Sequence, residues 1–136
     1  MHIVEKPLPW EVAGRLPLCL LTPEMHNRTI VDAAFLRAGV RVKPVIETNS
    51  ILTLGLSVLV GEVSSILPGA LVGVLRGYHE LEAVPLCDPE VVTPIGFMHA
   101  VTQRPTHTLR AALDLAGDLE WRQQVKAHTG LLHEQG

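Results

Sequence analysis

The sequence predicts an α/β fold in which helices flank a mostly parallel sheet, and three observations support this class. From residue 16 to residue 67, segments typical of strands alternate with segments typical of helices. Each of these strands is followed by residues that begin a helix well. The chain is 47% apolar and 18% charged, which is enough apolar material for a packed core. Strand–helix–strand connections are right-handed crossovers, so they place their strands parallel in one sheet.

The first strand is expected at residues 16–23 and leads into a helix. Asn27 is a good N-cap for this helix, and Gly39 is a good residue to follow its end. The apolar residues recur every three or four positions, as in a helix packed on a sheet. The pair Arg28 and Asp32, one turn apart, is expected on the exposed side.

The second half of the unit continues the alternation. A strand is expected at 43–47 and a helix at 51–60, which is apolar nearly all round and should therefore be enclosed on most sides. A short buried strand follows at 64–67. Glycines recur every four residues across 69–77, and in a chain without a membrane span this segment is interpreted as a glycine-loosened connector.

The flanking regions are less regular. Residues 1–15 are expected to be a polar lead-in, 81–87 a fourth strand and 91–101 a long extended run. A helix is expected to begin at Pro105 and Thr106, to be interrupted near Gly117 and to continue as a polar helix from 119 to 127. Its apolar face is formed by Leu109, Ala112, Leu113 and Ala116.

Charge and targeting signals exclude several classes of protein. The net charge is −3 and there is no basic block, so this chain alone should not bind nucleic acid appreciably. The N-terminus is not a signal peptide, and the apolar region 51–75 is too interrupted to span a membrane, so we expect a cytoplasmic protein. Cys19 and Cys87 are expected to be small buried hydrophobes without a disulfide.

The sequence contains no pattern typical of catalysis, of metal binding or of a cofactor. None of the seven histidines forms a helical i, i+4 pair, and no Cys-x-x-Cys is present. A metal site built across the fold stays open as an alternative. Glu47 is the best candidate for a general base, although such a residue is more often a solvated acid at a helix start. We therefore expect no catalytic residue, no cofactor and no enzyme.

Thr48, Asn49 and Ser50 form the most informative polar cluster. They precede a helix whose first backbone N–H groups are free, an arrangement that suits a small carboxylate or another anion. The alternative is a plain N-cap, in which one of the three caps the helix and the others face water. A second candidate rim runs from Thr22 to Asn27, and its His26 is more often an ordinary surface imidazole.

The order and spacing of several motifs resemble the distal lobe of the effector-binding domain in LysR-type transcriptional regulators. The corresponding runs are residues 16–28, 30–35, 44–51, 63–68, 83–89, 94–97 and 105–110. That domain is similar to the type 2 periplasmic binding proteins, in which two α/β lobes hold a small effector between them. The resemblance implies that 7–98 is the second lobe and that 99–136 is the return segment of the first.

The resemblance also implies site residues and partners. Thr48, Asn49 and Ser50 would lie on the rim of the effector cleft, with Thr22, Met25 and Pro68 near the ends of neighbouring strands. The chain would be the effector-sensing portion of such a regulator, binding a small, anionic metabolite and mediating oligomerisation. A stand-alone small-molecule (solute) binding half-domain is the alternative.

The sequence departs from the family in having no winged helix-turn-helix, no linker helix and no front half of the first lobe. Contact with DNA is therefore expected only through that missing N-terminal element. The helix that is expected to begin at Pro105 and Thr106 would also lack the part of the first lobe against which it usually packs. We expect the face formed by Leu109, Leu113 and Ala116 to be buried by another copy of the chain or by the chain's own sheet.

Overall fold

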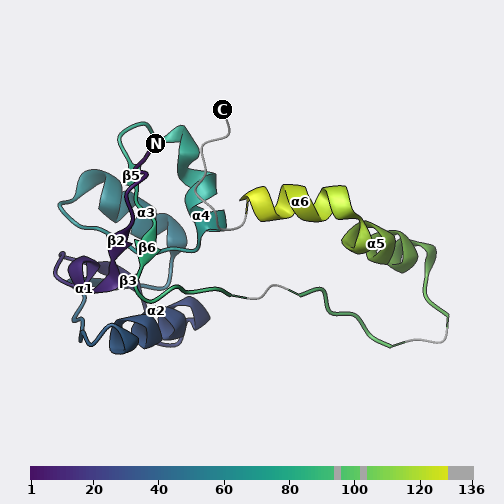
Figure 1. Cartoon of the computed structure of the whole chain (residues 1–136), viewed down its shortest axis with the longest axis horizontal. Coiled ribbons are helices and arrows are strands. Elements are labelled where there is room, and N and C mark those ends of the chain that lie inside the picture. The colour runs from purple at the N-terminus through teal and green to yellow at the C-terminus, as the bar shows by residue number, and fades with distance from the viewer. Residues whose placement is uncertain (94–95, 102–103, 129–136) are drawn as a thin grey trace.

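The computed structural model describes residues 1–93, 96–101 and 104–128. It consists of an α/β lobe, formed by the first ninety residues, and a helical arm that an extended segment carries away from it (Figure 1). Residues 94–95 of the expected extended run, and 102–103 and 129–136 of the expected return segment, lie outside the described residues.

The centre of the lobe is a parallel arrangement of strands, as the sequence predicts. β3 (Cys19–Leu21) pairs in parallel with β4 (Ile46–Thr48), and Leu20 lies opposite Glu47. On the other side of β3, Leu18 forms a single parallel bridge with Ser64, at the start of the strand expected at 64–67. All three residues of β3 are buried, which is typical of a parallel strand covered on both faces.

Helices α2 (His26–Arg37) and α3 (Ile51–Val60) cover opposite faces of these strands. Side chains alternate along a strand, so Leu18 and Leu20 pack with α2 residues while Cys19 and Leu21 pack with Leu54 of α3. The bounds of α3 agree with the sequence prediction. The prediction that α3 is enclosed is wrong, because Leu52 and Val60 are 69% and 83% exposed.

The N-terminal segment belongs to the fold, so the prediction of a polar lead-in is wrong. β1 (His2–Ile3) pairs in parallel with β5 (Glu82–Ala83), and β2 (Leu8–Pro9) pairs in parallel with β6 (Leu86–Cys87). The strand predicted at 81–87 is therefore two short strands. α1 (Trp10–Ala13) follows β2 and buries Trp10 and Ala13. The rings of Trp10 and Phe35 meet edge to face with centroids 5.1 Å apart.

The segment predicted as a loose connector is helical. α4 (Gly69–Val74) continues directly into η1, the 3-10 turn Leu75–Gly77. Pro68 fixes an extended backbone just before α4, and its carbonyl accepts N–H groups of Leu71 and Val72. Three glycines favour a loosened connector here, but Pro68 provides a good helix start, which outweighs their poor helix propensity.

The arm consists of α5 (His107–Gly117) and α6 (Leu119–His128), with the predicted break at Asp118. The Thr106 hydroxyl oxygen accepts the N–H of Leu109 at 3.1 Å and so caps α5. The apolar face of α5 is only half-buried, and α5 adjoins α6 rather than the strands of the lobe, so the expectation that the chain's own sheet buries this face is wrong. α6 in turn lies beside α4 (Figure 1).

One further expectation is corrected outside the helices. The described part of the run 91–101 is extended, as expected, and it pairs with no strand. Cys19 is fully buried as expected, whereas Cys87 is only half-buried; both thiols are free, and burial raises the pKa of each. Across the described ranges, no helix is both long and apolar enough to cross a bilayer.

Candidate functional site

The carboxyl ends of the central strands meet at one edge of the lobe. Thr22 directly follows β3 and Thr48 is the last residue of β4, and the N–H of Thr22 donates to the carbonyl of Thr48 at 3.0 Å. Pro68 follows the segment that begins with the Ser64 bridge on the other side of β3. Because these strands are parallel, all three residues lie at the same edge, where α3 and α4 begin.

Ser50 caps α3, and this leaves hydrogen-bond donors of its two preceding neighbours free to bind a ligand. Its hydroxyl oxygen accepts the N–H of Thr53 at 3.2 Å. The hydroxyl oxygen of Thr48 accepts the N–H of Ser50 at 3.1 Å, which leaves the hydroxyl proton of Thr48 available. Asn49 is exposed, and its side-chain amide has no partner among the described residues. The hydroxyl proton of Thr48 and the amide of Asn49 are thus both available in the two residues just before the cap of a ten-residue helix.

The residues at the other rim differ from the prediction. α2 begins at His26 rather than after Asn27, and Met25 occupies the N-cap position without a side-chain hydrogen bond to the helix. The side chain of Met25 packs against the Cys19, Leu21 and Leu54 cluster, so its role here is apolar. His26 is exposed, as expected.

Thr22 is already engaged with an acid of its own loop. Its hydroxyl donates to Glu24 Oε1 at 2.8 Å. A backbone N–H and this hydroxyl both lower the pKa of Glu24. The predicted rim residues therefore divide into the donors Thr48 and Asn49, the cap Ser50, the engaged Thr22, the apolar Met25 and the exposed ring of Pro68.

Arg28 also lies at this edge, and the sequence predicted neither its burial nor its contacts with Leu21 and Glu47. It was expected on the exposed side of its helix, but it is only 7% exposed. One terminal nitrogen donates to the carbonyl of Leu21 at 2.6 Å and to Glu47 Oε1 at 2.7 Å. Its Nε donates to Asp32 Oδ1 at 2.8 Å, which was the only partner that spacing along the helix could indicate.

The charge of Arg28 is compensated at this edge. Burial alone lowers the pKa of Arg28, but hydrogen bonds and charges from Glu47 and Asp32 outweigh burial and raise the pKa above its usual value. Arg28 therefore stays cationic and joins α2 to the residues that precede Thr22 and Thr48. Arg28 thus braces the rim, because its Nε and one terminal nitrogen are both engaged by residues of the lobe.

The structure gives Glu47 a structural partner. Its carboxylate binds Arg28, and no second acid, histidine or cysteine joins it in a group able to hold a metal ion within the ranges described. A lone, ion-paired carboxylate has no partner to complete general acid–base chemistry. What the edge offers is a set of hydrogen-bond donors at a helix start, and such a set suits the binding of an anion.

The comparison with protein families agrees with this geometry. A family model described as the LysR substrate binding domain matches residues 2–120. The match includes the N-terminal strands and most of the helical arm. No curated protein and no solved structure matches the chain.

Proteins with this domain are transcriptional regulators rather than enzymes, and the domain binds small-molecule effectors on a fold like that of the periplasmic binding proteins. The parallel strands and flanking helices of the lobe have the architecture expected of this fold. The chain belongs to the LysR substrate-binding domain family.

Proposed function

We propose that this chain senses a small anionic metabolite, such as a carboxylate, at the rim formed by Thr48, Asn49 and Ser50. The observation that carries the proposal is which side chain caps α3. The hydroxyl oxygen of Ser50 accepts the N–H of Thr53, so the hydroxyl proton of Thr48 and the amide of Asn49 remain as donors for a ligand. An anion at this position would also gain from the helix dipole. Thr22, Met25 and Pro68 complete the rim in this proposal.

The effector would act by differential binding. Residues 7–98 would form one lobe of the sensor, and 99–136 would return to the other. An anion that binds more tightly to one arrangement of the lobes shifts the population toward it, and no bond is made or broken. The shift would be transmitted through the oligomer to the DNA-reading part of a regulator.

A charge reversal at the rim tests the anion site. We expect Asn49→Asp to weaken binding of a carboxylate about tenfold or more, because a second negative charge within a few ångströms of the ligand costs on the order of 1–2 kcal/mol in a partly exposed site. The measurement is a thermal-shift screen of the chain with small carboxylates, followed by calorimetric titration of those that raise the melting temperature.

Gln123→Glu is the matched control, since it also replaces an exposed side-chain amide by a carboxylate, but on α6 rather than at the rim. It should leave carboxylate binding within about twofold of the unmodified chain. The proposal fails if no carboxylate binds, or if the two acidic variants weaken binding equally.

We further propose that the apolar face of α5 mediates self-association. Leu109, Leu113 and Ala116 are only half-buried, although the helix they belong to is amphipathic. An apolar stripe of this kind is commonly covered by another chain in solution. We expect light scattering after size exclusion to give the mass of a dimer or larger species, and Leu113→Asp to shift it to the monomer.

Leu115→Asp serves as the control for this test. Leu115 lies on the same helix but off that face, and it is 51% exposed. The same polar substitution there should leave the mass unchanged. A clean monomer for the unmodified chain would contradict the proposal.

A further inference from the structure

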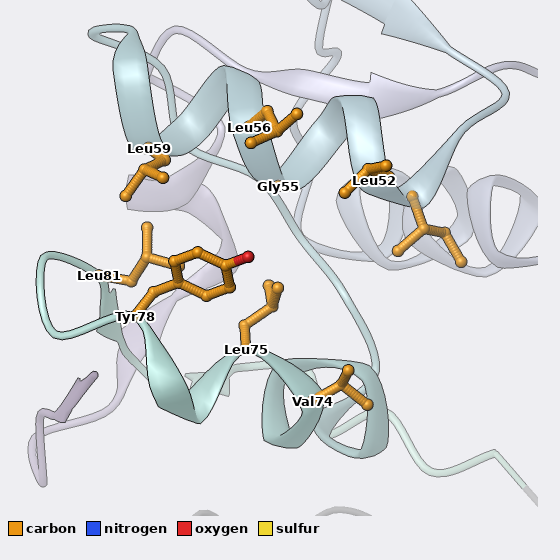
Figure 2. Close-up of a pocket in the computed structure, with 9 residues that line it drawn as sticks. Leu52, Gly55, Leu56, Leu59, Val74, Leu75, Tyr78 and Leu81 are labelled. Carbon is orange, nitrogen blue, oxygen red and sulfur yellow. The ribbon is translucent and has the colours of Figure 1, made fainter.

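A second binding feature lies along α3, away from the polar groups of the rim. An apolar pocket of about 200 Å³ opens between α3 and the α4–η1 segment (Figure 2). Its lining includes Leu52, Gly55, Leu59, Leu75, Tyr78 and Leu81. The hydroxyl of Tyr78 is the only polar side-chain group among the residues that line it.

The pocket exists because α3 carries a glycine where it faces the 3-10 turn. Gly55 is buried in the middle of the helix, although glycine is the poorest helix former after proline. A Cβ built at this position would lie 3.6 and 3.8 Å from the two methyl carbons of Leu75, at ordinary contact distance. A larger side chain at position 55 would therefore extend into the space that glycine leaves open.

The size and lining of the pocket define what it can hold. A buried water needs two to four polar partners, and this lining offers one hydroxyl, so water is held poorly. An engineered apolar cavity of about 150 Å³ binds benzene. The pocket is too small for a helix of another protein, and it fits one aromatic ring or a compact branched chain.

The pocket reaches the beginning of α3. Ile51 and Leu52 line one end, and they are the first two residues of the helix after the cap Ser50. In Figure 2, the lining runs along α3 from Leu59 to Leu52, with Tyr78 and Leu75 facing the helix from the other wall. Side chains on a helix lean toward its N-terminus, so Leu52 extends the apolar wall toward the rim.

We propose that this pocket binds an aromatic or branched aliphatic group of roughly six to ten carbons. This inference rests on the proposed function: the group is part of the effector, and the effector is then a carboxylate with a hydrophobic body. Binding transfers the ring from water into an apolar lining, and that transfer supplies affinity that a short carboxylate such as acetate lacks.

The test uses the 136-residue chain and three probes: p-cresol, 4-methylbenzoate and acetate. Methyl resonances of the leucines are followed by NMR during titration. We expect p-cresol and 4-methylbenzoate to shift the methyls of Leu59 and Leu75 saturably, whereas acetate leaves them unchanged. Gly55→Leu should weaken both aromatic probes at least tenfold, and Gly55→Ala, which adds one methyl group, should weaken them less.

Gly73→Leu is the matched control. Gly73 is also a helical glycine, but a Cβ there meets nothing within 4 Å and the residue does not line the pocket. This variant should bind both aromatic probes like the unmodified chain. Unchanged melting temperatures of the variants would show that loss of binding is not loss of folding.

The probes separate this proposal from the proposed function. If p-cresol binds and Gly55→Leu removes it while Asn49→Asp has no effect on 4-methylbenzoate, the pocket stands and the anion site fails. If carboxylate binding depends on Asn49 but Gly55→Leu leaves 4-methylbenzoate bound as before, the pocket proposal is overturned. It is also overturned if neither aromatic probe shifts the leucine methyls.

Discussion

Replacing Arg28 by methionine is expected to lower the free energy of unfolding by about 2–3 kcal/mol. The substitution removes a cation that is 7% exposed and leaves the carbonyl of Leu21 without its donor. A buried polar group left unsatisfied costs about 1–3 kcal/mol. The loss of Glu47 and Asp32 as partners adds less, because their side chains are 44% and 51% exposed and water can solvate them. Urea unfolding followed by circular dichroism measures the change.

Arg15→Met is the matched control. Arg15 also pairs with an acid four residues away, Glu11, but both side chains are well exposed. Its replacement should cost less than about 0.5 kcal/mol. Arg28→Lys should fall between the two, because an ammonium keeps the charge but cannot reproduce the planar fork of the guanidinium. Equal losses for Arg28→Met and Arg15→Met would show that Arg28 does not brace the edge.

The effect of Arg28 should extend to the rim. Its acceptors Leu21 and Glu47 each immediately precede a rim residue, Thr22 and Thr48. Without the brace, the ends of β3 and β4 remain joined by the hydrogen bond from Thr22 N to Thr48 O. The donors at the start of α3 would then be held less firmly, so the same variant should weaken carboxylate binding as well as stability.

The sequence could predict elements whose signals are local. The helix over 51–60 and the two helices separated at Asp118 follow from caps and apolar periodicity within a few residues. The parallel pairing of β3 with β4 follows from one crossover helix of ordinary length. The cluster at residues 48–50 was found because helix starts have a recognisable chemistry, although which of the three side chains forms the cap could not be known.

What the sequence could not predict depends on contacts between distant segments. The pairing of β1 with β5 joins residues about eighty positions apart, and two-residue strands leave almost no pattern. Arg28 was placed on the exposed side because only Asp32 lies within its own helix, whereas Glu47 is nineteen residues away. The sequence could not predict the pocket either, because one of its walls is the α4–η1 segment, for which the glycine spacing predicts a loosened connector instead of a helix.

The largest single loss is expected at Phe35. Phe35→Ala should lower the free energy of unfolding by about 3–5 kcal/mol, the usual range for removing a buried phenylalanine. The ring is 2% exposed and lies among Leu18, Leu20 and Trp10, so the cavity left behind would have little room to collapse. Part of the loss is the edge-to-face contact with Trp10, at a centroid distance of 5.1 Å.

Leu36→Ala is the control for this prediction, since Leu36 is the next residue of α2 and is 69% exposed. It should cost less than about 0.5 kcal/mol. A Trp10→Ala, Phe35→Ala double-mutant cycle then measures how much the contact between the two rings contributes to stability. The double variant should lose less than the sum of the two single variants, because the contact between the rings can be lost only once. Strict additivity would mean that the contact between the two rings adds nothing to the stability of the lobe.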